Sequence, residues 1–340
     1  MTPPLYQDYS LKPFNTFGIE AKAKFFGTFK SVEELQELLQ NPQIKEQPKL
    51  ILGGGSNLLF TRDFDGIVLK NEIKGVKVMP QNENFSLVEA GGGVKWHDLV
   101  LFCIEQNLAG IENLSLIPGT VGAAPLQNIG AYGVELKDVF HSLEAVDTET
   151  GEVVEFDKEK CAFGYRESIF KNEAKGKYIV THVTLQLQHQ PTFNTSYGAI
   201  QNTLKEMQVE ELSLKAVSDA VCQIRSSKLP DPNKIGNAGS FFKNPEINLT
   251  LFETLKKRFP EMPGYPVSEL SVKVPAGWLI EQCGWKGKTI GHFGVHKDQA
   301  LVLVNYGGAT GEEIRQLAHD IIVSVREKFG IELKPEVNII

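Results

Sequence analysis

The chain has 340 residues, of which 41% are hydrophobic and 23% are charged, and its formal net charge is -7. This composition is typical of a soluble globular protein that is long enough for two or three domains. The acidic balance excludes electrostatic attraction to a nucleic-acid backbone, and no apolar run approaches the roughly 20 residues that span a bilayer. Because the N-terminal segment has neither the basic nor the apolar region of a signal peptide, we expect a cytoplasmic protein without nucleic-acid or membrane partners.

Four cysteines, at positions 103, 161, 222 and 283, are dozens of residues apart. They form no Cys-x-x-Cys pair and no Cys/His cluster with the spacing of a zinc site. Cys103, Cys222 and Cys283 fall in apolar, helix-like settings, where a cysteine usually packs as a small core residue. We therefore predict structural thiols and no metal site.

The N-terminal seventy residues are predicted to be β-rich with one helix. Ser31 and Glu34 have the spacing of a capping box, and Leu35, Leu38 and Leu39 follow on one helical face. An apolar strand then runs into glycines in KLILGGGSNLLF, and short strands follow, interrupted by one helical stretch, KWHDLVLFCIEQN. This mixture indicates an α+β protein rather than a regular βαβ alternation.

The strand pattern breaks between residues 190 and 212. PTFNTSYGAI is a polar excursion with Tyr197 and Gly198 near its tip, and a helix over LKAVSDAVCQIRSSK follows. The next stretch, LPDPNKIGNAG, contains two prolines and two glycines and is a candidate domain boundary. Further on, a helix is predicted to begin at a Thr310/Glu313 capping box and to end at Gly330, and ELKPEVNII is predicted to close the chain as a strand.

Three glycine-rich segments stand out at residues 53–57, 91–93 and 117–133. Glycine lets the backbone approach a ligand closely, and successive N–H groups can bind an anion. No segment has the dinucleotide fingerprint GxGxxG, and GWKGKT lacks the spacing of a P-loop. A tight turn is an equally good interpretation of 91–93, whereas the aliphatic residues within 117–133 favour a buried backbone cradle. Spacing alone therefore predicts an anionic cofactor without identifying it.

Seven motifs in a fixed order give the chain a resemblance to a known family. They are GGGSN, IPGTVGAAPLQNIGAYG, FGYRESIFK, GNAGSFFKNP, AGWLIEQCGWKG, HKDQALVLVN and the terminal KPEV. In this order they resemble the UDP-N-acetylenolpyruvoylglucosamine reductases, flavoenzymes that complete UDP-N-acetylmuramate in bacterial cell-wall synthesis. The resemblance covers about residues 10 to 340.

The resemblance implies an FAD-binding fold of the vanillyl-alcohol-oxidase type, with two α+β subdomains that hold FAD and a C-terminal α+β subdomain that binds the UDP-sugar. It also implies NADPH as the reductant and a monomeric protein. Because GGGSN carries no histidine for covalent attachment, we expect non-covalent FAD. The expected ranges are 1–70 and 71–225 for the FAD-binding subdomains, 226–328 for the substrate-binding domain, and 329–340 for a terminal strand that carries Glu336.

The resemblance places the FAD contacts in the first and third glycine-rich segments. Small side chains and main-chain N–H groups there suit close contact with a large anionic cofactor. The residues expected to bind FAD are Gly53, Gly54, Gly55, Ser56, Asn57, Pro118, Gly119, Thr120, Gly122, Ala123, Gln127, Asn128, Gly130 and Ala131.

The implied reaction reduces the C=C bond of an enolpyruvyl group that carries a carboxylate. Negative charge develops beside that carboxylate as hydride adds to the terminal carbon, so the site needs a stabilising cation and a proton donor. The resemblance assigns Ser240 as the proton donor, Arg166 as the partner of the carboxylate, and Glu336 as an acidic third member. From the residues alone, Ser240 reads better as a hydrogen-bonding loop residue, Arg166 could pair with Glu167, and Glu336 could be a solvated edge residue.

Substrate contacts are also implied by the resemblance. Part of the family has an inserted loop whose tyrosine folds over the substrate, and TSYGAI, near residues 190–205, fits that loop. The alternatives are an exposed turn for Tyr197 and an unspecialised helix end for Lys228. We assign no role to His292 or His296. The residues expected to bind UDP-N-acetylglucosamine enolpyruvate are Tyr132, Tyr197, Lys228, Asn244 and Gln299.

Two other functions stay open from the sequence. A flavin oxidase of the same fold would use oxygen in place of the enolpyruvyl substrate, and the motifs GNAGSFFKNP and KPEV argue against it. A catalytically silent nucleotide-sugar binding protein is disfavoured because both Ser240 and Arg166 are present.

Overall fold

The computed structural model describes residues 3–340, which group into two compact units. Unit 1 is formed by the segments up to Tyr9, Ala23–Gly54 and Phe64–Ser227. Unit 2 is formed by Ser10–Lys22, Gly55–Asp63 and Lys228–Ile340. Both units are thus built from segments that are far apart in the sequence. The predicted four-part division of the chain stays a prediction.

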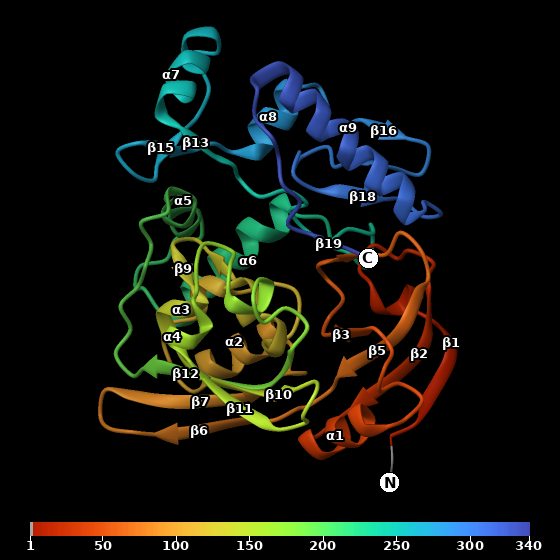
Figure 1. The fold of residues 1–340 in the computed structure, drawn as a ribbon. Coiled ribbons are helices and arrows are strands. Elements are labelled where there is room, and N and C mark those ends of the chain that lie inside the picture. Colours follow the sequence, from red (N-terminus) through yellow and green to blue (C-terminus); the bar gives the residue numbers. More distant parts are fainter. Residues whose placement is uncertain (1–2) are drawn as a thin grey trace. The chain divides into compact units, whose positions relative to one another are not determined.

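Unit 1 contains two larger β-sheets (Figure 1). Their strands are β1 (Leu5–Ser10), β2 (Lys22–Phe29), β3 (Lys49–Leu52), β5 (Phe64–Asn71), β6 (Val76–Pro80), β7 (Phe85–Gly91), β10 (Phe140–Asp147), β11 (Val153–Asp157) and β12 (Tyr178–Gln188). The first sheet has the order β1-β2-β5-β3, and both β2 and β3 run parallel to β5. The second has the order β11-β10-β12-β7-β6 and is antiparallel.

The larger core of unit 1 lies on one face of the second sheet. Buried residues alternate along much of β7 and β12, as expected for strands with one covered face. Helices α2 (Trp96–Glu105), α3 (Leu136–Val139) and α4 (Lys158–Cys161) lie over this sheet (Figure 1). The buried Trp96 donates its indole N–H to Leu114 O at 2.9 Å, which fixes α2 to the loop that follows it.

The first sheet packs against α1 (Val32–Gln40). Leu35 and Leu38 of this helix join Leu69 of β5 in a buried cluster that also contains Ile179 of β12. The two sheets of unit 1 therefore share a core, and each buried aliphatic side chain there contributes about 1.5–3 kcal/mol.

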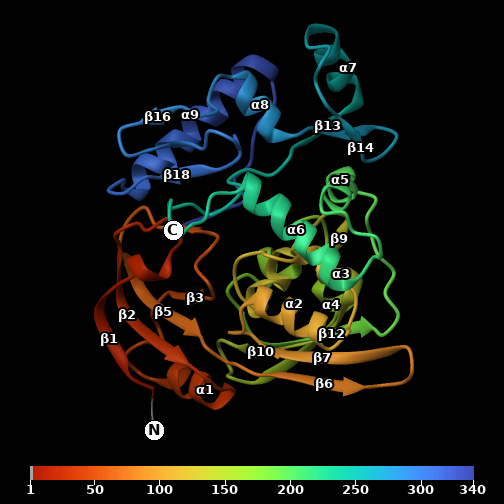
Figure 2. The same cartoon turned by 180° about the vertical axis from the view of Figure 1, so that it is seen from behind.

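Two further helices, α5 (Gly198–Glu206) and α6 (Leu214–Lys228), belong to the same part of the chain (Figure 2). Ile200 and Leu204 of α5 form a buried cluster with Val221 and Ile224 of α6. Helix α6 has the bounds that its sequence predicts, LKAVSDAVCQIRSSK. A short hairpin of β8 (Gly130–Ala131) and β9 (Val134–Glu135) begins at the end of the third glycine-rich segment and extends just beyond it.

Unit 2 contains two small antiparallel sheets, β13-β15-β14 and β16-β17-β18. In addition, the strand at Asn338–Ile339 runs parallel to the one at Leu58–Leu59. The elements of this unit are β4 (Leu58–Leu59), β13 (Glu246–Asn248), α7 (Leu249–Arg258), β14 (Tyr265–Pro266), β15 (Ser271–Lys273), α8 (Ala276–Gln282), β16 (Thr289–Ile290), β17 (Phe293–Val295), β18 (Leu303–Asn305), α9 (Gly311–Phe329) and β19 (Asn338–Ile339).

The long helix α9 begins and ends at the predicted residues. Glu313 N donates to Thr310 Oγ1 at 3.2 Å, and Thr310 N donates to the Glu313 carboxylate at 2.7 Å, which completes the predicted capping box. The helix ends where Gly330 adopts a φ of 69°, a conformation that glycine reaches without steric cost. No helix within residues 3–340 is long and apolar enough to cross a membrane.

One local prediction is wrong. The carboxylate of Glu34 accepts from Lys30 N at 2.6 Å, one residue before Ser31, so Ser31 caps α1 without a reciprocal bond. In addition, the excursion around Tyr197 leads into a helix that the sequence signals did not predict, because α5 begins at Gly198. Packing of its apolar face against α6 outweighs the weak local helix signal.

The predicted terminal strand is limited to Asn338–Ile339. Pro335 has no N–H to donate to a neighbouring strand, and it forms only an isolated bridge with Phe242. On either side of this proline, Lys243 N donates to Lys334 O at 3.0 Å and Glu336 N donates to Phe241 O at 2.8 Å.

Asn71 connects the two sheets of unit 1 beneath the second glycine-rich segment. It is 5% exposed, donates through Nδ2 to Val180 O at 2.9 Å, and accepts through Oδ1 from Ile73 N at 3.0 Å. A Cβ at Gly92 would lie 2.5 Å from Asn71 Nδ2, so this carboxamide requires glycine beside it.

We predict that Asn71→Ala lowers the free energy of unfolding by about 2–4 kcal/mol, because a buried carbonyl and a buried N–H lose their partners. Urea denaturation would measure this change. Asn202→Ala, at an exposed site on α5, is the control and should leave the midpoint nearly unchanged. Equal midpoints for the two variants would contradict the prediction.

Candidate functional site

Within unit 1, the glycines at 53 and 54 of the first segment and at 92 of the second lie against the third glycine-rich segment. A Cβ at Gly54 would lie 2.9 Å from Gly119 Cα, and one at Gly53 would lie 2.3 Å from Thr120 Oγ1. A Cβ at Gly122 would lie 3.0 Å from Gly92 Cα. Such contacts leave no room for a larger side chain. The glycines are therefore needed for packing between the segments.

Strained backbone is concentrated around the third segment. Leu116, Asn128 and Tyr132 have φ values of 57°, 43° and 51°, and Arg166 has a φ of 56°. Non-glycine residues with positive φ are uncommon, and they gather at ligand sites where the surrounding structure holds them. This observation makes the segment a candidate binding site independently of its sequence motif.

The exposed side of the third segment is apolar. Leu116 and Leu126 are each 36% exposed, and Pro118 lies between them in sequence and is also exposed. Val121 and Ile129 are buried and anchor the segment from below. The predicted backbone cradle is therefore only partly buried, and its outer side offers apolar side chains together with main-chain groups of glycine and alanine.

Arg225 is a site residue that the sequence interpretation missed. Its Nε donates to Leu116 O at 3.2 Å, and its guanidinium hydrogen-bonds to the side chain of Tyr132. Burial lowers the pKa of the Arg225 guanidinium from its ordinary value, and the neighbouring Arg166 acts in the same direction. The available signal was its position on α6, four residues after the buried Val221, where a helical arginine lies close to the buried face.

Tyr132 and Tyr197 lie together. Their rings are 5.5 Å apart between centroids and meet edge to face, at 88°. Burial raises the pKa of the Tyr132 phenol, and the charge of Arg225 opposes this shift. Tyr197 remains 54% exposed. The structure thus brings together two of the predicted substrate residues and adds Arg225 to them.

Arg166 belongs to the same unit and is held by the third glycine-rich segment. Its guanidinium donates to Asn128 O at 3.4 Å and to Gly130 O. Its Cζ also lies 5.4 Å from the centroid of the Tyr165 ring. Main-chain carbonyls therefore fix the orientation of the arginine side chain.

In unit 2, the main chain brings Ser240 and Glu336 near each other. Ser240 forms an isolated bridge with Val302, and Phe241 N donates to Leu301 O at 2.7 Å. On its other side, Phe241 O accepts from Glu336 N at 2.8 Å. The segment that carries Ser240 thus lies between residues 301–302 and the segment that carries Glu336. Both Ser240 and Glu336 are partly exposed.

Asn237 shapes the backbone that leads to Ser240. It is 4% exposed, and its Nδ2 donates to Pro230 O at 3.1 Å and to Ile235 O at 2.8 Å. Its Oδ1 accepts from Gly239 N at 2.9 Å, and Gly239 has a φ of 70°. The small residues of GNAGS therefore form a turn fixed by one buried carboxamide.

The remaining predicted residues are distributed over both units. Gly55, Ser56 and Asn57 belong to unit 2, and Asn57 Nδ2 donates to Glu336 O at 3.3 Å. Asn244 Oδ1 accepts from Ala276 N at 2.9 Å and so caps the start of α8, while Gln299 Oε1 accepts from Leu301 N at 3.4 Å. Lys228, the last residue of α6, is exposed.

Cys222 of α6 lies near Tyr132 and Arg225, whereas Cys103 and Cys161 are buried in the larger core of unit 1. Burial raises the pKa of the Cys103 and Cys161 thiols to about 12, so both remain protonated at neutral pH. Within residues 3–340, no group of three or more His, Cys, Asp or Glu side chains is placed to hold a metal ion.

His97 supports the strained Leu116. Its Nδ1 accepts from Leu116 N at 3.0 Å, which requires that nitrogen to be unprotonated. Burial lowers the pKa of the His97 imidazole, Arg225 adds to this shift, and Asp98 opposes it. Since the pKa is lower in the folded state, the stabilisation is present above the unfolded pKa of about 6.5 and is lost as the pH falls below it.

We predict that His97→Gln, which keeps an acceptor but does not titrate, makes stability less sensitive to acid. The midpoint of thermal unfolding should fall less between about pH 7 and pH 5 in the variant than in the wild type. Other titrating groups are common to both proteins, so the difference between the two curves isolates His97. Parallel curves would show that His97 does not contribute.

Comparison with known proteins identifies the family. A model described as "FAD binding domain" matches residues 23–157, and one described as "UDP-N-acetylenolpyruvoylglucosamine reductase, C-terminal domain" matches residues 231–340. The chain is 53% identical over 336 residues to the UDP-N-acetylenolpyruvoylglucosamine reductase of Amoebophilus asiaticus, and 52% identical over 337 residues to that of Flavobacterium johnsoniae. Each alignment covers 99% of this chain and 99% of the relative.

A solved structure shows the same fold. The crystal structure of UDP-N-acetylenolpyruvylglucosamine reductase from Thermus caldophilus matches with a TM-score of 0.68 at 24% identity and covers 100% of this chain and 99% of that one. The predicted α+β class and FAD-binding fold are confirmed. The chain therefore belongs to the UDP-N-acetylenolpyruvoylglucosamine reductase family.

Proposed function

We propose that the chain catalyses the reaction of this family, in which NADPH reduces UDP-N-acetylglucosamine enolpyruvate to UDP-N-acetylmuramate with FAD as the cofactor. Full-length similarity to reductases of this name supports the activity. The structural observation that carries the proposal is the pairing of the Ser240 segment with the Glu336 segment in unit 2. This pairing brings two residues that are 96 positions apart in the sequence into one local structure.

The glycine-rich segments fit FAD. The contact of Gly54 with Gly119 leaves small residues and main-chain groups along an apolar rim, a surface suited to an extended cofactor with an anionic diphosphate. We propose that FAD is held by residues 53–57 and 118–131, without a covalent bond, since GGGSN offers no histidine. When bound, FAD supplies the transfer of hydride from NADPH to the terminal enolpyruvyl carbon.

Ser240 is the proposed proton donor. Its hydroxyl gives a proton to the carbon that carries the carboxylate, which completes the saturated lactyl group. A serine hydroxyl is a weak acid, so its position has to compensate for its low acidity. The turn fixed by Asn237 and the flanking buried Phe241 and Phe242 support this role, because they restrict the conformations of the segment.

Arg166 and Glu336 are the proposed charge-handling residues. A guanidinium offers a planar pair of donors that matches a carboxylate, and the carbonyls of Asn128 and Gly130 already orient it. Developing negative charge is stabilised most by donors that are fixed in advance. Glu336 is proposed to share a proton with the enolate-like intermediate.

The UDP-sugar contacts are proposed for Tyr132, Tyr197, Lys228, Asn244 and Gln299. Lys228 suits a diphosphate as a flexible cation, and the phenols offer an apolar face with a hydrogen-bonding group. The edge-to-face contact of Tyr132 with Tyr197 supports a shared role for these two residues.

We predict that Ser240→Ala separates the two half-reactions. Anaerobic addition of NADPH should bleach the yellow protein at the wild-type rate, whereas UDP-N-acetylglucosamine enolpyruvate should restore the colour at least 100-fold more slowly, a loss expected of a general acid. Stopped-flow absorbance measures both steps. Restoration at the wild-type rate would remove Ser240 as the proton donor, and colour that returns only with oxygen would favour the oxidase alternative.

We further propose that the protein acts as a monomer in the cytoplasm, where NADPH and nucleotide sugars are made. The family resemblance supports this proposal. Sedimentation of the purified protein should give a single species near 37.7 kDa. A species of twice that mass at micromolar concentration would contradict the monomer.

A further inference from the structure

We propose that Asn113 and Asn194 are positioning residues for Tyr197. The inference rests on the proposed function, which places Tyr197 on the UDP-sugar. Both asparagines belong to unit 1, and together they fasten the segment before Tyr197 to the third glycine-rich segment. We refer to residues 191–197 as the tyrosine loop.

Asn113 is the buried residue of the pair that holds the tyrosine loop. Its side chain is 0% exposed, and its Nδ2 donates to Tyr132 O at 3.1 Å and to Asn194 O at 2.8 Å. Its Oδ1 has no hydrogen-bond partner among the described residues. A buried acceptor without a partner is destabilising. The benefit of this side chain therefore comes from its two donated bonds, one to each of the segments that carry the tyrosines.

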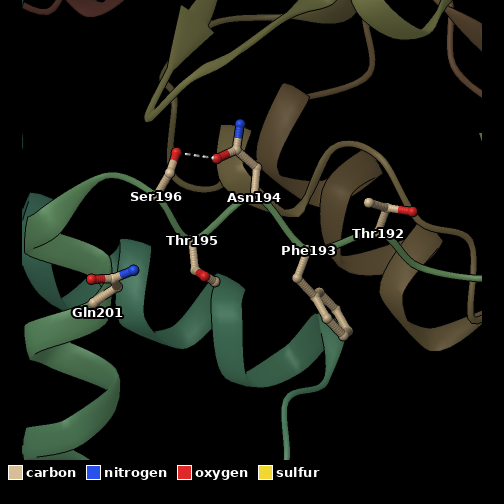
Figure 3. A pocket seen from close by; sticks show the side chains of 6 residues that line it. All are labelled: Thr192, Phe193, Asn194, Thr195, Ser196 and Gln201. Atoms are coloured by element: carbon tan, nitrogen blue, oxygen red, sulfur yellow. Dashed lines mark hydrogen bonds between the residues drawn. The ribbon is translucent and has the colours of Figure 1, made fainter.

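Asn194 is the residue of the pair that lies in the tyrosine loop itself. Its Nδ2 donates to Gly133 O at 3.1 Å, and its Oδ1 accepts from Ser196 Oγ at 2.9 Å. A Cβ at Gly133 would lie 2.9 Å from Asn194 Nδ2, so the glycine makes room for the carboxamide. Figure 3 shows Asn194 and Ser196 on one side of the loop, with Phe193 and Thr195 on the other.

The tyrosine loop is largely exposed at residues 191–192 and 196–197 and partly exposed at residues 193–195. A surface cavity of about 470 Å³ is lined by Thr192, Phe193, Asn194, Thr195, Ser196 and Gln201 (Figure 3). Tyr197 itself is 54% exposed, so packing alone does not hold it. Its position depends on two anchors, which are α5 on its C-terminal side and the two asparagines on its N-terminal side.

Both anchors act on the same pair of rings. Tyr132 packs against the cluster between α5 and α6, and its carbonyl accepts from Asn113. Tyr197 follows Asn194 by three residues and meets the Tyr132 ring edge to face. The asparagines therefore set the distance between the two backbones that carry these rings. A loop that is ordered before binding avoids the entropy cost of ordering during binding.

The decisive variant is Asn194→Ala, at a partly exposed position where folding is expected to tolerate the change. We expect the KM for UDP-N-acetylglucosamine enolpyruvate to rise about five- to twentyfold, with kcat changed less than about twofold, because the bonds order the loop and do not touch the reacting atoms. Asn113→Asp, which replaces the donor by an acceptor at nearly constant volume, should have the same effect. Asn202→Ala on α5 is the matched control.

A double-mutant cycle with Tyr197→Ala tests whether Asn194 acts through the tyrosine. If it does, adding Asn194→Ala to Tyr197→Ala leaves KM unchanged within about twofold, since the positioned group is already gone. If Asn194 acted independently of Tyr197, the rise in KM of the double variant would be the product of the rises in the two single variants. Thermal unfolding of each variant shows that it is folded at the assay temperature.

Several outcomes would overturn the inference. Asn194→Ala with a wild-type KM, multiplicative effects in the cycle, or Tyr197→Ala without any effect on KM would each do so. If Asn113→Asp fails to fold, the KM of Asn194→Ala and the double-mutant cycle still test the inference. A wild-type protein that is inactive on UDP-N-acetylglucosamine enolpyruvate would instead refute the proposed function, so the two failures are distinguishable.

Discussion

The architecture of unit 1 depends on the close approach of glycine-rich backbones. Where Gly54 meets Gly119 and Gly122 meets Gly92, added Cβ atoms would lie at or below 3.0 Å from backbone carbons of the opposing segment. These contacts join the loop after β3 of the first sheet to the long loop between α2 and α3, and join that long loop to the residues that follow β7 of the second sheet. Side chains hold the strained residues at the two ends of the third segment, since Arg225 donates to Leu116 O and the buried Asn113 donates to Tyr132 O. The same glycines that attract attention as a cofactor motif are thus first of all packing residues.

Buried asparagine side chains hold individual loops in place. Asn71, Asn113 and Asn237 are nearly or fully buried, and each links main-chain groups through its carboxamide. A carboxamide has both donors and acceptors, so one side chain can hold turns that have no regular hydrogen-bonding pattern of their own. This explains how loops that carry candidate binding and catalytic residues can be ordered without belonging to a helix or a sheet.

Local sequence signals predicted the elements whose causes are local. The bounds of α6 and the caps of α9 follow from apolar periodicity and from Thr310, Glu313 and Gly330. Contacts between distant segments were not predictable in this way. Helix α5 forms because it packs against α6. Arg225 of α6 hydrogen-bonds to the side chain of Tyr132, which lies in a distant segment, and the main chain of Glu336 hydrogen-bonds to that of Phe241. The candidate site residues came from a resemblance of motifs, because spacing alone leaves Ser240 as an ordinary loop serine.

The segmented composition of unit 2 affects how the chain can fold during synthesis. Leu58 and Leu59 pair with a strand at residues 338–339, and Asn57 O accepts from Asn338 N across 281 positions. At about 5–20 residues per second, a ribosome needs roughly 15–60 s to make the partner of this early strand. Asn305 likewise reaches back to Phe17 O, at 2.8 Å. Unit 2 can therefore be completed only after residues 338–339 have been synthesised, and until then Leu58 and Leu59 remain without their native partners.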